Sequence, residues 1–89
     1  MKDLAVRLRI PRKYAITCAN GIMERLWHYT AKYAPQGDIG RVPDEHIADA
    51  CGWPTEHHSE LVAALVGARW LDRDEKHRLI VHDWHDHAD

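Results

Sequence analysis

Histidine and aspartate residues gather at the end of this 89-residue chain, in a pattern that points first to metal chemistry. His82, His85 and His87 are interleaved with Asp83 and Asp86. Imidazole and carboxylate groups both bind zinc, but structural zinc sites normally hold four ligands on well-defined turns. A terminal run without such a framework favours adventitious metal binding, so we predict neither a metal site nor any other cofactor.

Residues that could support catalysis are sparse. The only serine, Ser59, follows His58, and neighbouring residues on a helix point in different directions. The sequence contains no phosphate-binding loop, dinucleotide-binding glycine turn, nucleophile elbow or zinc-protease motif. These absences predict a protein that is not an enzyme.

Charge is distributed unevenly along the chain. Residues 1–41 contain eight Lys or Arg against three Asp or Glu, whereas residues 42–89 contain four against eleven. The net charge at pH 7 is only −2 with neutral histidines. This balance excludes a uniformly basic nucleic-acid-binding protein, but it allows a molecule with one basic end.

The basic end is concentrated in the first thirteen residues, where only Asp3 opposes the positive charge. Its members are Lys2, Arg7, Arg9, Arg12 and Lys13. Each contact between such a side chain and a DNA phosphate releases counterions and strengthens binding. The segment is therefore our first candidate for DNA contact, and a basic, solvated helix without a partner is the alternative.

Hydrophobic spacing predicts the elements that would position these residues. Apolar residues recur every three or four positions over residues 15–33, which predicts a long amphipathic helix. Its apolar stripe includes Ile16 and Tyr33, and Cys18 is expected to be a buried, reduced thiol on the same stripe. Gly21 interrupts good helix formers and predicts the close approach of another backbone.

Further segments lie on either side of this helix. Residues 2–10 are expected to form a short helix, although their alternation of apolar residues also fits a strand. Residues 39–42 have extended character. Pro43 then suits the first turn of a helix that buries Cys51 and ends at Gly52.

The last third of the chain is expected to contain one more helix followed by two short strands. Thr55 is a favourable N-cap for a helix over about residues 56–66, whose apolar residues include Leu65. Residues 69–72 and 79–82 are expected to form two short strands, and the charged residues between them have the length of a hairpin loop.

Four segments resemble small winged-helix domains of phage and prophage proteins. They are LWHYTAKYAPQGDIGR, DEHIADACGWP, LVAALVGARWLDRD and RLIVHDWHDHA. The resemblance covers nearly the whole chain and implies one mainly α domain, residues 1–89, with a small β-hairpin. The implied winged helix-turn-helix has three or four helices and a short two- or three-stranded antiparallel sheet. Similar domains form the N-terminal piece of replication-initiator-like (replisome-organiser) proteins.

The resemblance implies where DNA would be contacted. In a DNA-binding winged helix, the second helix of the helix-turn-helix enters the major groove and the hairpin touches the backbone. Here that helix contains no Lys or Arg, and Glu56 and Glu60 repel phosphates, so a packing helix with a solvated face is the alternative. The residues predicted to contact DNA are Arg7, Arg9, Arg12, Lys13, His57, His58, Ser59, Arg73, Lys76 and Arg78.

The sequence thus predicts a cytoplasmic, non-catalytic domain of a phage or prophage replication or regulatory protein that binds double-stranded DNA. No apolar run is long enough for a transmembrane helix, and the first ten residues lack the apolar stretch of a signal peptide. The alternative is a protein-interaction module that uses the acidic helix face, and a homodimer is possible. DNA binding predicts that the basic cluster lies near the hairpin, whereas the interaction module predicts that it lies far away.

Overall fold

A computed structural model describes residues 2–84 of the chain. This part contains four α-helices and one two-stranded antiparallel sheet, which confirms the predicted mainly α fold with a small hairpin. None of these helices has the length and apolar content that a membrane span would need. The α-helices and strands are α1 (Lys2–Arg7), α2 (Ala15–Tyr33), α3 (Asp44–Ala50), α4 (His58–Gly67), β1 (Leu71–Asp74) and β2 (Arg78–Val81). Short 3-10 helices precede α2, α3 and α4: η1 (Arg12–Tyr14), η2 (Ile39–Arg41) and η3 (Thr55–His57).

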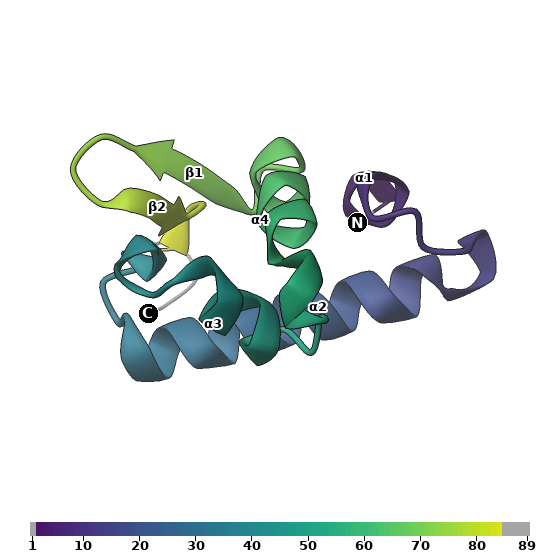
Figure 1. The fold of residues 1–89 in the computed structure, drawn as a ribbon, viewed down its shortest axis with the longest axis horizontal. Helices are drawn as coiled ribbons and strands as arrows, with labels where there is room; N and C mark the ends of the chain where they lie inside the picture. Colours follow the sequence, from purple (N-terminus) through teal and green to yellow (C-terminus); the bar gives the residue numbers. More distant parts are fainter. Residues whose placement is uncertain (1, 85–89) are drawn as a thin grey trace.

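The long helix α2 is the base on which the other elements pack, and it runs along one side of the molecule (Figure 1). Its middle contributes Ala19, Ile22, Met23 and Leu26 to the core. The fully buried residues from the other elements are Leu4, Ile39, Ile47, Leu61, Leu65, Leu71, Leu79 and Val81. One hydrophobic core therefore joins the helices to the hairpin.

The predicted apolar stripe of α2 is correct in the middle and wrong at the ends. Ile16 is 61% exposed and Tyr33 is 55% exposed. Cys18 is exposed as well, so the prediction of two buried thiols holds only for Cys51. These residues are exposed because α2 has 19 residues and the elements that pack against it bury only part of its length. Burial raises the pKa of the Cys51 thiol to about 12.

Close approach of a backbone occurs at Gly40 and not at Gly21. A Cβ at Gly21 would have no neighbour within 4 Å, so that prediction is wrong. A Cβ at Gly40 would overlap the carbonyl oxygen of His77 and the amide nitrogen of Leu79. The absence of a side chain at Gly40 therefore allows η2 to pack against the end of the hairpin.

Residues 39–42 do not form the extended segment that the sequence predicts. Buried Ile39 begins the 3-10 helix η2, in which Val42 N–H donates to the Ile39 carbonyl (3.0 Å). The segment before it reaches the sheet through one hydrogen bond, from Val81 N–H to the Gly37 carbonyl (2.9 Å). One such bond adds no third strand, so the sheet of the described residues has two.

The hairpin begins two residues later than predicted. Leu71 pairs with Val81 and Asp74 with Arg78, and the strands are antiparallel. Arg69 adopts a left-handed conformation, with φ of +65°, and ends the turn after α4. A strand cannot begin until the chain leaves that turn, which shifts β1 to residues 71–74. Beyond β2, the buried Trp84 indole donates to the Pro35 carbonyl (2.8 Å) and fastens the chain to the turn after α2.

Candidate nucleic-acid interface

Helix α4 presents a polar face that differs in extent from the predicted one. The helix begins at His58, and Thr55–His57 form the 3-10 helix η3, so the predicted α-helical start at residue 56 is wrong. The Thr55 side chain makes no capping hydrogen bond. A 3-10 turn is common at the start of an α-helix, and η3 contains no buried residue.

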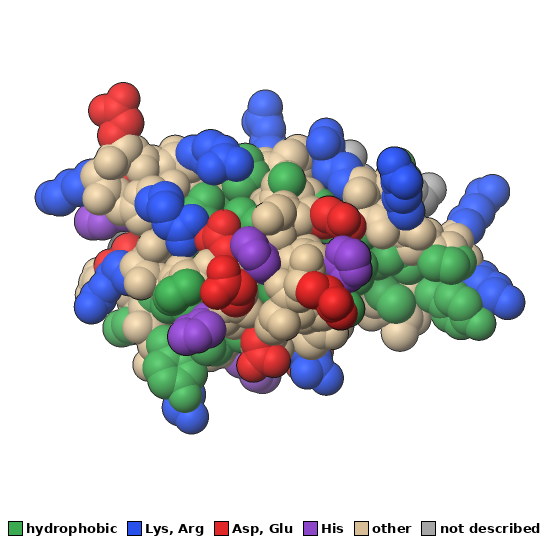
Figure 2. Space-filling view, in the orientation of Figure 1, with side chains coloured by type: hydrophobic (Ala, Val, Ile, Leu, Met, Phe, Trp, Pro, Cys, Tyr) green, Lys and Arg blue, Asp and Glu red, His purple; other side chains and the backbone are tan. Residues whose placement is uncertain are grey.

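The histidines at the start of α4 lie beside carboxylates. His57 Nδ1 is 3.4 Å from a carboxylate oxygen of Glu60, and His58 Nε2 is 3.5 Å from one of Glu45 on α3. Ser59 Oγ is 3.5 Å from His58 Nδ1. Figure 2 shows Asp, Glu and His side chains gathered over α3 and the start of α4, and we call this surface the acidic face. Its carboxylates are Asp44, Glu45, Asp49, Glu56 and Glu60.

The acidic face is a poor surface for DNA at neutral pH. Its five carboxylates oppose phosphate, and His57 and His58 carry positive charge only when protonated. The commonest specific contact to a base, a bidentate Arg, is missing from α4. The predicted base contacts by His57, His58 and Ser59 therefore have weak electrostatic support.

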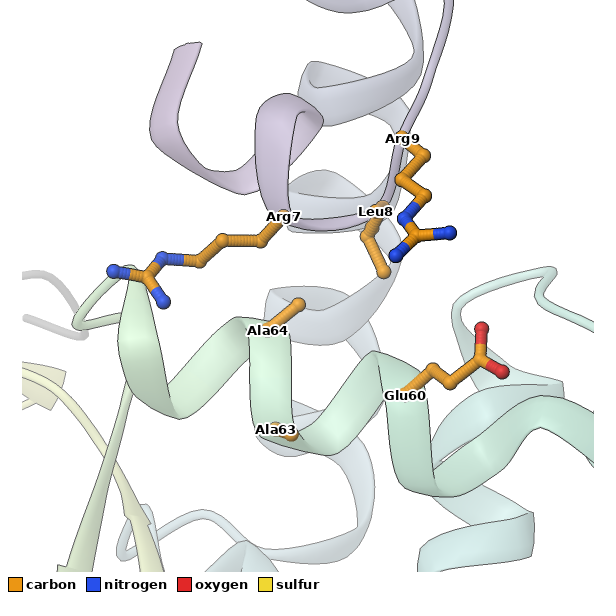
Figure 3. Close-up of a pocket in the computed structure, with 6 residues that line it drawn as sticks. All are labelled: Arg7, Leu8, Arg9, Glu60, Ala63 and Ala64. Atoms are coloured by element: carbon orange, nitrogen blue, oxygen red, sulfur yellow. The ribbon is translucent and has the colours of Figure 1, made fainter.

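Two arginines of the basic N-terminal segment lie against α4. Arg7 and Arg9 border a shallow hollow that is also lined by Leu8 of the same segment and by Glu60, Ala63 and Ala64 of α4 (Figure 3). Arg7 reaches over the C-terminal end of α4, where a Cβ on Gly67 would lie 2.5 Å from its guanidinium. The structure thus places part of the predicted basic cluster beside α4.

The rest of the cluster lies farther along the chain. Arg12 and Lys13 belong to η1 and are exposed, and Lys13 Nζ lies 5.1 Å from the centre of the Tyr14 ring. In Figure 1, η1 is at the opposite end of the molecule from the hairpin. The molecule is 35 Å long, so the cluster as a whole is not beside the hairpin.

All three predicted cations of the hairpin are exposed, and two of them, Arg73 and Lys76, make no ion pair with the described residues. Arg73 and Lys76 are exposed, and the Asp74 carboxylate accepts hydrogen bonds from the Lys76 (3.1 Å) and His77 (2.8 Å) amides. These bonds shape the turn that presents Lys76. Asp74 therefore has a structural role in the hairpin loop.

Arg78 has a different position from the other predicted contact residues. Its guanidinium donates to Asp44 Oδ1 (2.6 Å), to the Val42 carbonyl (2.9 Å) and to the Gly40 carbonyl (3.1 Å). These bonds use three of its five N–H donors and hold the hairpin to the segment that leads into α3. We assign it a structural role and leave it out of the proposed DNA contacts.

No group of three or more metal-binding side chains is arranged around a common point within residues 2–84. The terminal run of His and Asp is only partly described, because His85, Asp86 and His87 lie outside these residues. His82 instead pairs with Asp72 at 2.7 Å and with Asp83 at 3.3 Å.

His82 provides a prediction about pH. Its hydrogen bond to Asp72, supported by the charges of Asp72 and Asp83, raises the pKa of His82 above the ordinary value of 6.5. A raised pKa in the folded state means that the pair stabilises the fold fully below pH 6.5 and ceases to do so as pH rises through the folded value. NMR titration of His82 should therefore give a pKa above 6.5 in the parent and a lower one in Asp72→Asn.

The control for this titration is Glu75→Gln, at the exposed turn of the same hairpin, which should leave the pKa of His82 unchanged. An identical pKa in the parent and in Asp72→Asn would mean that the pair does not persist in solution.

Arg69 was not among the residues predicted to contact DNA. It is exposed, follows the last turn of α4 and makes no ion pair with any side chain that the structure describes. The sequence contained one indication of this position. The helical spacing of apolar residues stops at Val66, so Arg69 lies where a helix commonly ends in a left-handed residue.

Comparison of this chain with protein-family models, with curated proteins and with solved structures found no match.

Proposed function

We propose that this chain is a non-catalytic winged-helix module that binds double-stranded DNA through phosphate contacts. In this proposal α3 and α4 are the helix-turn-helix and the β1–β2 hairpin is the wing. The main support is a set of exposed cations without a carboxylate partner among residues 2–84. Those in the N-terminal segment, after α4 and in the hairpin are Arg9, Arg12, Lys13, Arg69, Arg73 and Lys76, and Arg25 and Lys32 on α2 share the same property.

The distribution of charge supports backbone contact over base reading. In Figure 2 many Lys and Arg side chains lie along the upper rim and at the ends of the molecule, and a few lie at its lower edge. The acidic face lies between them and below. A duplex that follows the rim would meet positive charge from the basic N-terminal segment and from the wing. Binding would then depend weakly on sequence and strongly on salt.

The resemblance to phage and prophage domains supports the biological setting. We propose that the chain is the N-terminal module of a cytoplasmic replication or regulatory protein and that its role there is to hold duplex DNA. No cofactor or catalytic residue is part of this proposal.

A salt titration on random duplex tests the proposal. Changing Arg7, Arg9, Arg12 and Lys13 together to Gln should weaken binding to duplex of any sequence. The slope of log affinity against log salt should also become shallower by roughly 0.9 for each phosphate that the variant no longer neutralises. Fluorescence anisotropy with a labelled duplex measures both quantities.

The control changes three exposed cations outside the proposed contact, Arg25, Lys32 and Arg41, to Gln, and of these Arg41 lies 3.7 Å from Asp38. These substitutions should leave the slope close to that of the parent. Parent binding that is weak, insensitive to salt and equal in both variants would overturn the DNA assignment.

One observation favours the alternative of a protein-interaction module. The acidic face is continuous across α3 and α4, and η1 lies far from the wing. Glu60→Gln separates the two functions. It should slightly strengthen duplex binding if DNA is the ligand, because it removes a repulsive charge, and it should weaken capture of a basic protein if the acidic face is the binding surface.

A further inference from the structure

Three helices of this chain end in the same backbone motif. In each, the third residue beyond the helix donates its N–H to a carbonyl five residues earlier, and the residue before it is left-handed. The three long-range bonds are Ile10 N–H to Ala5 (3.0 Å), Trp53 N–H to Ala48 (2.9 Å) and Trp70 N–H to Leu65 (2.9 Å). The left-handed residues are Arg9 (φ +57°), Gly52 (φ +76°) and Arg69 (φ +65°).

Arginine is an unfavourable choice at such a position. Glycine reaches the left-handed region without a steric penalty, whereas the Cβ of any other residue meets the backbone there. Gly52 follows this preference after α3, so the motif itself does not require a side chain. Arg9 and Arg69 depart from it at the ends of α1 and α4.

A third left-handed arginine, Arg78, is explained by its contacts within the fold. Arg78 has φ of +69°, and its guanidinium makes three hydrogen bonds that hold the hairpin in place. Arg9 and Arg69 are exposed, and neither makes an ion pair or a side-chain hydrogen bond with the residues that the structure describes. Contacts within the fold therefore explain Arg78 and leave Arg9 and Arg69 unexplained.

Arg9 and Arg69 border the same helix. Arg9 lines the hollow over Glu60 and Ala63 of α4 (Figure 3), and Arg69 follows the end of that helix. Helix α4 has ten residues, so its axis is about 15 Å long at 1.5 Å per residue. DNA carries one phosphate per 3.4 Å of axis on each strand, so several phosphates of one strand would span the length of α4.

We propose that Arg9, beside the first turns of α4, and Arg69, after its last turn, form a phosphate clamp along α4 and hold the backbone of one DNA strand. This inference rests on the proposed function and deepens it, because it names the two arginines that would hold the backbone beside α4. A residue other than glycine at a left-handed helix end is a departure from local preference, and such departures are expected at functional or strained sites. A guanidinium on a rigid turn is well placed to contact phosphate.

The experiment measures stability and binding in the same variants. Arg9→Gly and Arg69→Gly should each raise Tm by several degrees, because glycine removes the left-handed penalty. Each should also lower affinity for random duplex at 0.1 M salt by about 5- to 10-fold and reduce the salt slope by roughly 0.9. Arg9→Lys and Arg69→Lys should keep the parental slope, since Lys retains the charge.

Two controls separate the clamp from general effects. Arg41→Gly, at an exposed arginine of η2, should leave duplex affinity unchanged. Arg78→Gly should lower Tm, because it removes the three hydrogen bonds of the guanidinium. A fall in Tm for Arg69→Gly would overturn the clamp, since it would show that Arg69 serves the end of α4 through the helix dipole.

The outcomes also distinguish the clamp from the proposed function. If Arg9→Gly and Arg69→Gly bind duplex like the parent, while Arg12→Gln with Lys13→Gln reduces the salt slope, the clamp is wrong and DNA binding stands. If the parent shows no salt-dependent duplex binding, both fail. Opposite changes in Tm and affinity in the two glycine variants support the clamp.

Discussion

Replacing Leu65 by Ala is expected to lower the free energy of unfolding by about 2–5 kcal/mol. Leu65 is fully buried on α4, which packs against α1, α3 and β1, so the missing methyl groups would leave a cavity where these elements meet. Small domains have total stabilities of about 5–15 kcal/mol, so this single change removes a large share. Urea unfolding followed by circular dichroism measures the decrease.

The control for Leu65→Ala is Ser59→Ala, on the exposed face of the same helix, which should change stability by less than about 0.5 kcal/mol. A decrease below about 1 kcal/mol for Leu65→Ala would show that the α4 register is wrong, because truncating a buried leucine has a larger effect. The assignment of Glu60 and Ala63 to the outer surface would then fail with it.

Replacing Gly40 by Ala is expected to destabilise the protein by about 1–3 kcal/mol. The new methyl group would overlap the His77 carbonyl oxygen and the Leu79 amide nitrogen. Both are backbone atoms that cannot rotate away, so either η2 or the hairpin has to move. The displacement should also disturb the hydrogen bonds of Arg78, because one of them is accepted by the Gly40 carbonyl.

Gly21→Ala is the matched control for Gly40→Ala. Its methyl group would enter open space on a helix interior, where Ala is favoured over Gly by about 0.5–1 kcal/mol, so stability should rise. Urea unfolding of both variants measures the change in the free energy of unfolding, which should fall for Gly40→Ala and rise for Gly21→Ala. Equal stability of Gly40→Ala and the parent would mean that η2 does not pack closely on β2.

The candidate interface combines residues that the sequence identified with others whose roles only the fold reveals. The exposed cations of the N-terminal segment were predicted from their concentration alone, and their exposure follows from the polarity of Arg and Lys. Their distance from the hairpin was not predictable, because it depends on how α1 and η1 pack against the rest of the fold.

Arg78 illustrates the limit of inference from composition. It belongs to the charged hairpin loop by sequence and resembles Arg73 and Lys76 in type. Its partners Asp44, Val42 and Gly40 lie 34 to 38 residues earlier in the chain. Sequence spacing contains no information about such pairs until the topology brings them together.

The sequence by itself determined the features that depend on local geometry. Apolar residues at helical spacing predicted the long helix α2 and placed Leu61 and Leu65 on the inner face of α4, because periodicity indicates which side of a helix is buried. Pro43 and Gly52 marked the limits of α3, because proline and glycine restrict or free the backbone at their own positions.

Only the tertiary structure decided how far each buried face extends and which backbones meet. Ile16 and Cys18 continue the pattern of α2, but they are exposed because no neighbouring element covers them. The close approach of a backbone that was predicted at Gly21 occurs at Gly40. Periodicity describes one element at a time, whereas exposure and close approach are properties of pairs of elements that are distant in the chain.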